Sequence, residues 1–202
     1  RIETHNSGLT TMSLIMSDRV LRLTLGAGEH LPSNVPWRID DGYLRVSSWG
    51  DHAEQFTLGL WGPGELVIPA LIGVQPMELT ALSSVCVEAH EPSQAEKQFF
   101  LEDQVQQASK LLQLTRVRPA ELRLLHLLMW LGQRFGRVSS RGISLSFDDM
   151  NLTHRHLAEL AGLTRVTVTK ALSRFRQEGV LLTDGSDALL LPGRCDDLHW
   201  FN

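Results

Sequence analysis

The first ninety residues alternate between apolar and polar positions in several short runs. These runs are residues 21–25, 43–48, 55–60 and 85–89. Alternation with a period of two is typical of strands that bury one face of a sheet. Glycine, aspartate and proline gather between the runs, and these residues favour tight turns. The pattern predicts short antiparallel strands folded into a compact β-roll of the jelly-roll type.

The pattern changes from strand to helix after Pro92. Ser93 is suited to cap a helix, and neither glycine nor proline recurs before Pro119. Within this stretch, apolar residues recur at alternating spacings of four and three, as in a coiled-coil seam. They are Leu101, Val105, Ala108 and Leu112. The sequence predicts one long helix over residues 93–117, whose seam either meets a second copy of the chain or covers the β-roll.

A second helix and two pairs of short strands are expected in the rest of the chain. Pro119 suits the first turn of a helix, which should end near Gly132 or Gly136. A small hairpin is expected directly after this helix. Two apolar runs at residues 180–183 and 188–191 flank an Asp-Gly-Ser-Asp turn, and this arrangement predicts a two-stranded wing.

Residues 152–175 have the pattern of a helix-turn-helix, counted from His154 as the first position of a twenty-residue unit. Ala158 stands at the fifth position, where the two helices touch, and Gly162 stands at the ninth, where the backbone turns. Val168, at the fifteenth, is a branched apolar residue that holds the second helix. Residues of these kinds at these places are what the motif requires. Together with the wing, they predict a winged helix-turn-helix.

The second helix of the motif carries side chains that a purely structural hairpin does not need. Thr164 is placed to cap this helix. The residues that then face outward are Arg165, Val166, Thr169, Lys170 and Ser173. Arginine and lysine contact guanine edges or phosphates, whereas valine offers only methyl contact, for instance to thymine. Because β-branched residues are poor helix formers, stability alone does not explain this sequence, and we interpret the face as one that reads DNA.

The net charge of −4 conceals two parts of opposite sign. Residues 1–117 hold 8 basic and 14 acidic residues, a net charge of −6, and residues 118–202 hold 11 basic and 9 acidic residues, a net charge of +2. Between residues 151 and 180, five basic residues stand against two acidic ones. Phosphate contact requires a local cationic field of this kind. The charge pattern therefore assigns DNA binding to the second part and another task to the first.

Composition excludes several other classes of protein. No apolar stretch reaches the roughly 20 residues needed to span a bilayer, and no secretory signal is recognisable at the start of the sequence. The two cysteines, Cys86 and Cys195, are too few for a disulfide framework or for an iron–sulfur cluster with four cysteine ligands. We expect a cytoplasmic protein with reduced thiols, no membrane contact and no bound cofactor.

A β-roll, a long helix and a C-terminal winged helix, in this order, resemble the CRP/FNR superfamily of bacterial transcription regulators. The similarity is most specific between Leu122 and Leu182, and it includes Gly-Leu-Thr-Arg-Val-Thr-Val-Thr at residues 162–169. Within that segment, residues 164–169 are most similar to the cyanobacterial global nitrogen regulators. The resemblance implies an α+β fold with a cyclic-nucleotide-binding-like β-roll (residues 1–92), a dimerisation helix (residues 93–117) and a winged helix-turn-helix (residues 118–202).

The resemblance also implies a homodimer that binds a two-fold symmetric site in double-stranded DNA and regulates transcription, with RNA polymerase as a further partner. The helix-turn-helix behind the seam itself favours the dimer role of the seam, since half-sites one DNA turn apart suit a two-fold dimer. The resemblance makes Arg165 and Lys170 the pair that reads bases or contacts phosphate. Further phosphate contacts are implied for Thr153, Thr164 and Thr167. The cyclic-AMP receptor of this superfamily has a cytosine-reading glutamate where this chain has Val166, so the central base preference is expected to differ.

The first part departs from the cyclic-nucleotide binders of the superfamily. Gly-Pro-Gly-Glu at residues 62–65 is similar to their glycine-rich turn, which puts Gly64 and Glu65 at the expected effector pocket. Those proteins then carry an arginine that neutralises the cyclic phosphate, whereas residues 73–80 contain no arginine and Glu78 lies near its place. Because a carboxylate there repels phosphate, we expect no binding of cyclic AMP and leave the effector unidentified.

Two other functions stay open from the residues themselves. The β-roll can serve without an effector, for dimerisation or for contact with a partner protein. Alternatively, residues of the β-roll can be gathered into the metal site of a cupin-type enzyme: His30, His52, Glu54, Glu65 and His90. The His-x-His pair typical of such enzymes is missing there, and scattered histidines are weak evidence of a metal site. We therefore predict a DNA-binding regulator and not an enzyme.

Overall fold

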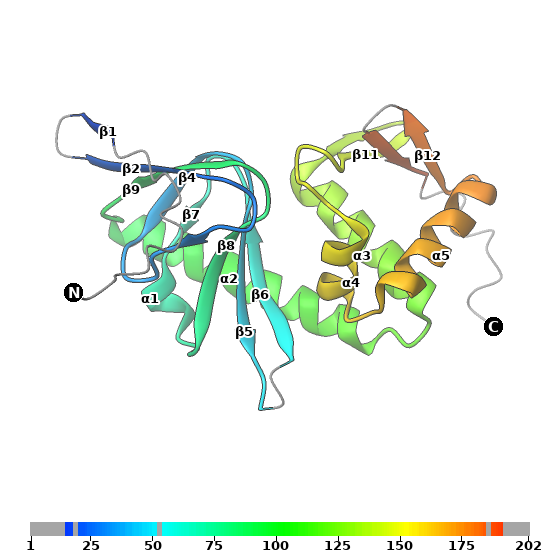
Figure 1. Cartoon of the computed structure of the whole chain (residues 1–202), viewed down its shortest axis with the longest axis horizontal. Helices are drawn as coiled ribbons and strands as arrows, with labels where there is room; N and C mark the ends of the chain where they lie inside the picture. Colours follow the sequence, from blue (N-terminus) through cyan, green and yellow to red (C-terminus); the bar gives the residue numbers. More distant parts are fainter. Residues whose placement is uncertain (1–14, 18–19, 52–53, 185–186, 192–202) are drawn as a thin grey trace, which may run out of the picture.

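The computed structural model describes residues 15–17, 20–51, 54–184 and 187–191. Figure 1 shows a β-rich part and a mixed part of helices and strands, with the long helix α2 (Gln94–Arg116) running between them. Two separate clusters of buried apolar side chains hold the structure together. The predicted order of β-roll, long helix and winged helix-turn-helix is confirmed, and with it the α+β fold class.

In the β-rich part, the residues that the structure describes form two antiparallel sheets and one short helix, α1 (Pro69–Ile72). In sheet order, the five-stranded sheet contains β1 (Ile15–Ser17), β2 (Val20–Leu25), β9 (Val85–Ala89), β4 (Trp37–Asp41) and β7 (Leu66–Val67). The four-stranded sheet contains β3 (His30–Leu31), β8 (Met77–Ala81), β5 (Leu44–Trp49) and β6 (Gln55–Trp61). Side chains from both sheets share one buried cluster, which includes Trp37, Ile39, Leu44 and Leu79.

The four predicted runs are strands β2, β5, β6 and β9. The remaining strands of the β-roll were not predicted. Strands β3 and β7 have two residues each, too few for a period to be recognised. Strands β4 and β8 do alternate, and each buries two side chains, Trp37 and Ile39 in β4 and Leu79 and Ala81 in β8.

Helix α2 begins after Ser93, as predicted. The Ser93 Oγ accepts a hydrogen bond from the Glu96 N–H (3.3 Å), and the Glu96 carboxylate accepts one from the Ser93 N–H (2.9 Å). Hydrogen bonds from Ser93, and a further one with His90, lower the pKa of Glu96 to about 2, because only the ionised carboxylate accepts all of them. This reciprocal cap fixes the point at which the chain leaves the β-roll.

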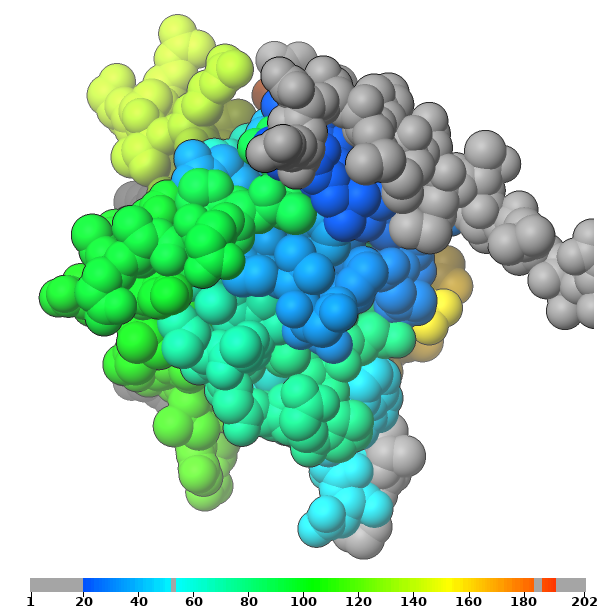
Figure 2. Space-filling model, turned by 90° about the vertical axis from the view of Figure 1, so that its left-hand side faces the viewer, coloured from blue at the N-terminus to red at the C-terminus, as the bar shows by residue number. Residues whose placement is uncertain are grey.

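One face of helix α2 packs against the rest of the molecule, and another face is exposed. The buried residues are Phe100, Gln107, Leu111 and Leu114. The predicted seam lies on the exposed face, where Leu101, Val105 and Leu112 are 42%, 64% and 60% exposed. Its fourth member, Ala108, is also exposed. The seam therefore does not serve to cover the β-roll, which was one of its two predicted roles. Figure 2 shows the first turns of α2 (green) at the molecular surface beside the β-roll.

The described residues of the C-terminal part form three helices and a four-stranded antiparallel sheet. Its elements are α3 (Ala120–Phe135), β10 (Arg137–Ser139), β11 (Gly142–Ser146), α4 (His154–Ala161), α5 (Arg165–Gln177), β12 (Leu181–Asp184) and β13 (Asp187–Leu190). The predicted hairpin and wing share one sheet, since β11 pairs with β13 as well as with β10. Gly132 lies inside α3 rather than at its end, and a side chain there would overlap Ile143 of β11.

Ion pairs join the β-roll to the C-terminal part. Arg45 of β5 is buried and donates to Glu159 of α4, with its Nη1 2.6 Å from the Glu159 Oε2. Arg134 of α3 donates to Glu65, just before β7, and to Asp103 of α2. These contacts connect residues that are far apart in the sequence. They fix the position of α4, and hence of the helix-turn-helix, relative to the β-roll.

Candidate nucleic-acid interface

Two threonines and one glycine define the backbone of the helix-turn-helix. The Thr153 Oγ1 accepts from the His156 N–H (3.1 Å) where α4 begins. The Thr164 Oγ1 accepts from the Thr167 N–H (3.1 Å) where α5 begins. Gly162 ends α4 with a φ of 61°, a left-handed conformation that favours glycine. The predicted cap of α5 and the predicted turn are both confirmed.

Apolar residues of α4 and α5 meet in one buried contact. They are Leu157, Ala158, Leu160, Val168, Ala171, Leu172 and Phe175. Helix α3 packs against both helices from behind. Burial of one face of α5 fixes the rotation of that helix about its axis, so the opposite face points to solvent.

All five residues predicted to face outward on α5 are exposed: Arg165, Val166, Thr169, Lys170 and Ser173. Positions i, i+1, i+4, i+5 and i+8 lie on one side of a helix. Val166 is 63% exposed and presents a methyl surface between polar neighbours. The structure thus brings the predicted residues together on one face.

The positive charge of this region is divided between paired and unpaired side chains. Arg155 and Arg174 form ion pairs with carboxylates of the protein itself. Arg165, Lys170 and Arg176 form no ion pair with any residue in the described ranges. A cation that is already paired with a carboxylate of the protein gains less free energy from contact with a phosphate. The three remaining cations are therefore the ones best placed to attract an anion.

The threonines predicted to contact phosphate lie at the starts of α4 and α5. Thr153 and Thr164 are exposed, and Thr167 is half-buried. The hydroxyls of Thr164 and Thr167 lie 2.8 Å apart, so one of their two protons is used between them. Helix N-termini favour anions because their first N–H groups are unpaired within the helix. The position of all three residues is compatible with the predicted role.

Thr169 is held by a residue that the sequence reasoning did not assign to the interface. The Thr169 Oγ1 donates to the Arg165 carbonyl oxygen (2.9 Å), and the His154 Nδ1 lies 2.9 Å from the same Oγ1. Because the hydroxyl proton is already committed, the His154 Nδ1–H is the donor and Thr169 keeps one lone pair. Only the folded turn brings His154, at the start of α4, to the recognition helix. In the sequence, the only indication of this role was a polar residue at the start of the first helix of the motif.

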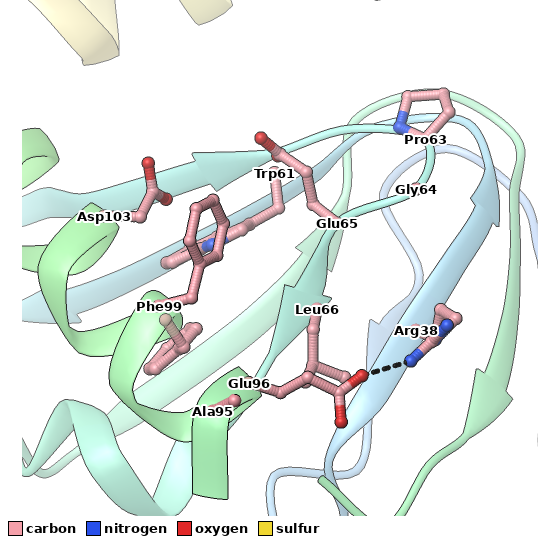
Figure 3. A pocket seen from close by; sticks show the side chains of 11 residues that line it. Arg38, Trp61, Pro63, Gly64, Glu65, Leu66, Ala95, Glu96, Phe99 and Asp103 are labelled. Atoms are coloured by element: carbon pink, nitrogen blue, oxygen red, sulfur yellow. Dashed lines mark hydrogen bonds and ion pairs between the residues drawn. The ribbon is translucent and has the colours of Figure 1, made fainter. Parts of the chain in front are cut away.

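Two of the residues predicted at the effector pocket line a hollow of about 720 Å³ between the glycine-rich turn and the start of α2. Figure 3 shows Gly64 and Glu65 on one side of it and the Phe99 ring on the other. The Glu65 carboxylate is engaged by the protein, since it accepts from Arg134 (2.9 Å) and from the Gly62 N–H (2.7 Å). Burial raises the pKa of Glu65, although the Arg134 charge opposes the rise.

The third residue predicted at the effector pocket, Glu78, lies elsewhere. It lines a separate hollow of about 280 Å³ together with Arg45 and Glu159, and its Oε1 lies 3.1 Å from the His30 Nδ1. Glu78 belongs to β8 of the four-stranded sheet, whereas Glu65 precedes β7 of the five-stranded sheet. The structure therefore does not unite these carboxylates in one pocket, and the expectation that they share one is corrected.

The described part of the chain contains no group of three or more His, Cys, Asp or Glu side chains arranged to hold a metal ion. His30 and His90 pair with different carboxylates and do not meet, while His52 and Cys195 lie outside the described residues. Within the same ranges, no helix combines the length and the apolar character that crossing a membrane demands.

Comparisons with known proteins agree on the kind of protein. Residues 122–192 match the model of the Crp-like helix-turn-helix domain. The chain is 40% identical to the regulatory protein CysR of Synechococcus elongatus over 160 residues, which cover 78% of each protein. The narrower similarity of residues 164–169 to global nitrogen regulators stays a prediction about the recognition helix alone.

Solved structures of low sequence identity have the same fold. A CRP/FNR-family transcriptional regulator from Thermus thermophilus is similar with a TM-score of 0.63 and 20% identity, over 87% of this chain and 96% of that one. FixK2 from Bradyrhizobium japonicum is similar with a TM-score of 0.68 and 16% identity, over 89% of this chain and 96% of that one.

Proposed function

We propose a mode of DNA recognition for this chain, which belongs to the CRP/FNR superfamily of transcription regulators: two copies form a homodimer, and the α5 helix of each reads the major groove of a two-fold symmetric site. Membership in the superfamily makes the chain a regulator with a DNA-binding helix-turn-helix and not an enzyme. The observation that carries the proposal is the exposed face of α5, where cations without an ion-pair partner in the described ranges flank a methyl surface and a hydroxyl acceptor.

Each exposed residue of α5 has a distinct chemical role in this proposal. Arg165 and Lys170 contact guanine edges or phosphates, and Val166 contacts the methyl group of thymine. Because Thr169 keeps only acceptor capacity, it suits the amino groups of adenine or cytosine. Ser173 extends the same face, and the capping threonines of α4 and α5 contact phosphates. The central base preference then differs from that of the cyclic-AMP receptor, which reads cytosine with a glutamate at the position of Val166.

The exposed seam of α2 is the proposed dimer contact. Burial of apolar surface is the dominant favourable contribution to most protein associations, and four residues at alternating spacings of three and four meet an identical helix well. A two-fold dimer presents two copies of α5 to successive turns of the major groove. The seam therefore supplies the second reading helix that one chain lacks. Since the proposed target is chromosomal DNA, we assign the protein to the cytoplasm, with RNA polymerase as the partner through which it acts.

Regulation without an effector at the predicted pocket is the second candidate. It is favoured by the engagement of Glu65 with Arg134 and by the separate location of Glu78. In this form the β-roll orients the helix-turn-helix through internal ion pairs. DNA affinity that stays unchanged across a panel of small metabolites, cyclic AMP included, is the expected result, whereas a shift of DNA affinity with any of them would contradict this candidate.

Arg165→Ala is expected to reduce discrimination between the preferred site and single-base variants by about 1–3 kcal/mol, because a side chain that reads a base is lost. The preferred site is first selected from a random DNA pool, and affinities are then measured by gel shift. The matched variant is Arg176→Ala, which is expected to weaken binding to all sequences alike and to reduce the salt slope by about 1. Equal, sequence-independent losses in both variants would exclude base reading by Arg165. Absence of any DNA complex of the folded protein at low salt would refute the function itself.

A further inference from the structure

His154 lies at the junction of the two helices of the motif. It is the first residue of α4 and is half-buried. Its Nδ1 lies 2.9 Å from the Thr169 Oγ1, which in turn donates to the Arg165 carbonyl oxygen (2.9 Å). Two successive hydrogen bonds therefore connect the His154 imidazole to the backbone of the recognition helix. Since Nδ1 is used in this bond, Nε2 is the imidazole atom left to bind or release a proton.

The free protein disfavours a positive charge on His154. Burial lowers the pKa of the imidazole, and the charges of Arg176 and Arg165, both on α5, lower it further. The N-terminus of α4 acts in the same direction, because its N–H groups repel a cation. His154 is thus neutral at physiological pH while the protein is free, beside two arginines that have no ion-pair partner in the described ranges.

A DNA phosphate reverses this balance. An anion bound near Arg165 and Arg176 neutralises the charges that repel a proton from His154, and it is itself an acceptor for the imidazolium. We propose that His154 is a further DNA-contacting residue: it positions the Thr169 hydroxyl and, once protonated, contacts a backbone phosphate, so that DNA binding takes up a proton. This inference rests on the proposed DNA-binding function, which it deepens.

The sign of the pH dependence follows from this coupling. The imidazole holds its proton more tightly in the complex than in the free protein, so lowering the pH strengthens binding. The gain is complete below the pKa of the free protein, and it is lost as the pH rises through the pKa of the complex. A rise of one pKa unit on binding corresponds to about a tenfold gain in affinity per subunit.

The test measures the affinity of the full chain for its selected DNA site between about pH 5.5 and pH 8, at constant salt because phosphate contacts are salt-dependent. For His154→Gln we expect a loss of most of the pH dependence and, at high pH, an affinity no greater than that of the unmodified protein. For His154→Arg, which keeps its charge at every pH, we expect a similarly flat profile and no drop in affinity at high pH. Circular dichroism checks that both variants are folded.

The matched control is His156→Gln, two residues further along α4. The His156 Nδ1 bonds the Asn151 carbonyl oxygen (2.7 Å) and not the recognition helix, so this variant should keep the full pH dependence. If His154→Gln retains the pH profile of the unmodified protein, the inference is overturned while the DNA-binding function stands. If the unmodified protein binds DNA equally well at all pH values, the inference also fails. If the unmodified protein binds no DNA at any pH, both the proposed function and this inference are refuted.

Discussion

Replacing both Val105 and Leu112 by glutamate is expected to convert the proposed dimer into monomers and to weaken binding to a two-fold site by about a hundredfold or more. Both side chains are more than half exposed on the seam of α2. In a dimer, four carboxylates would then face one another in an apolar contact, where charge is disfavoured. Loss of the second α5 removes the gain from linked binding, which amounts to about 10²–10⁴ in affinity. Analytical ultracentrifugation measures the oligomeric state, and gel shifts compare the full site with a half-site.

The control for this experiment is Phe99→Glu on the same helix. Phe99 is 73% exposed but lies at the hollow beside the glycine-rich turn, on a different side of α2 from the seam. We expect this variant to stay dimeric and to bind the full site normally. A double variant at residues 105 and 112 that remains a dimer would refute the assignment of the seam, and a monomer that still prefers the full site would refute the role of dimerisation in DNA affinity.

Glu159→Ala is expected to lower the free energy of unfolding by about 3 kcal/mol, because it leaves a buried guanidinium without its carboxylate. The Arg45 side chain is only 5% exposed and lies 2.6 Å from the Glu159 carboxylate. Gln55 offers it a single longer contact of 3.2 Å, which does not replace a charge. Urea denaturation at neutral pH measures the loss.

Arg155→Ala provides the matched control, since Arg155 bonds the same carboxylate from solvent and is 80% exposed. Exposed ion pairs contribute about 0–1 kcal/mol, so this variant should be nearly as stable as the unmodified protein. Equal losses in the two variants would contradict the distinction between the buried and the exposed partner.

The contribution of Glu159 should also depend on pH. Burial opposes ionisation of its carboxylate, but hydrogen bonds from Arg155 and Arg45 outweigh burial and lower the pKa. A lowered carboxylate pKa stabilises the fold above the usual carboxylate range, and the effect is lost as the pH falls through the pKa of the folded state. The difference between the unmodified protein and Glu159→Ala is therefore expected to shrink in acid.

Sequence periodicity was sufficient to predict those features whose structure depends on residues close together in the sequence. The Ser93 cap, the Gly162 turn and the outward face of α5 depend on residues within one or two helical turns of each other, and all were predicted. The seam of α2 was recognised, but its two possible roles could be separated only by exposure. Exposure depends on which face of α2 the β-roll occupies, and the helix sequence does not contain that information.

Long-range pairs account for what the sequence could not predict. Arg45 and Glu159 are separated by 114 residues, and no local pattern marks either as the partner of the other. Glu65 was interpreted as an effector residue from its neighbours, but Arg134, 69 residues away, engages its carboxylate. His154 was passed over because its contact with Thr169 exists only after the turn has folded. Polar residues acquire their roles from tertiary partners, and a single sequence does not identify those partners.

The shared sheet of the C-terminal part has a consequence for how DNA specificity can change. Strand β11 precedes the helix-turn-helix in the sequence, and β13 follows the helix-turn-helix. Strand β11 is hydrogen-bonded to β10 on one side and to β13 on the other. A segment excised around α4 and α5 alone would leave behind the strands and the α3 surface that support it. The smallest portable unit therefore runs from α3 through β13. On the proposed function, a new target sequence is therefore expected to be acquired by substitution on α5 in place, rather than by transplanting the two helices into another protein.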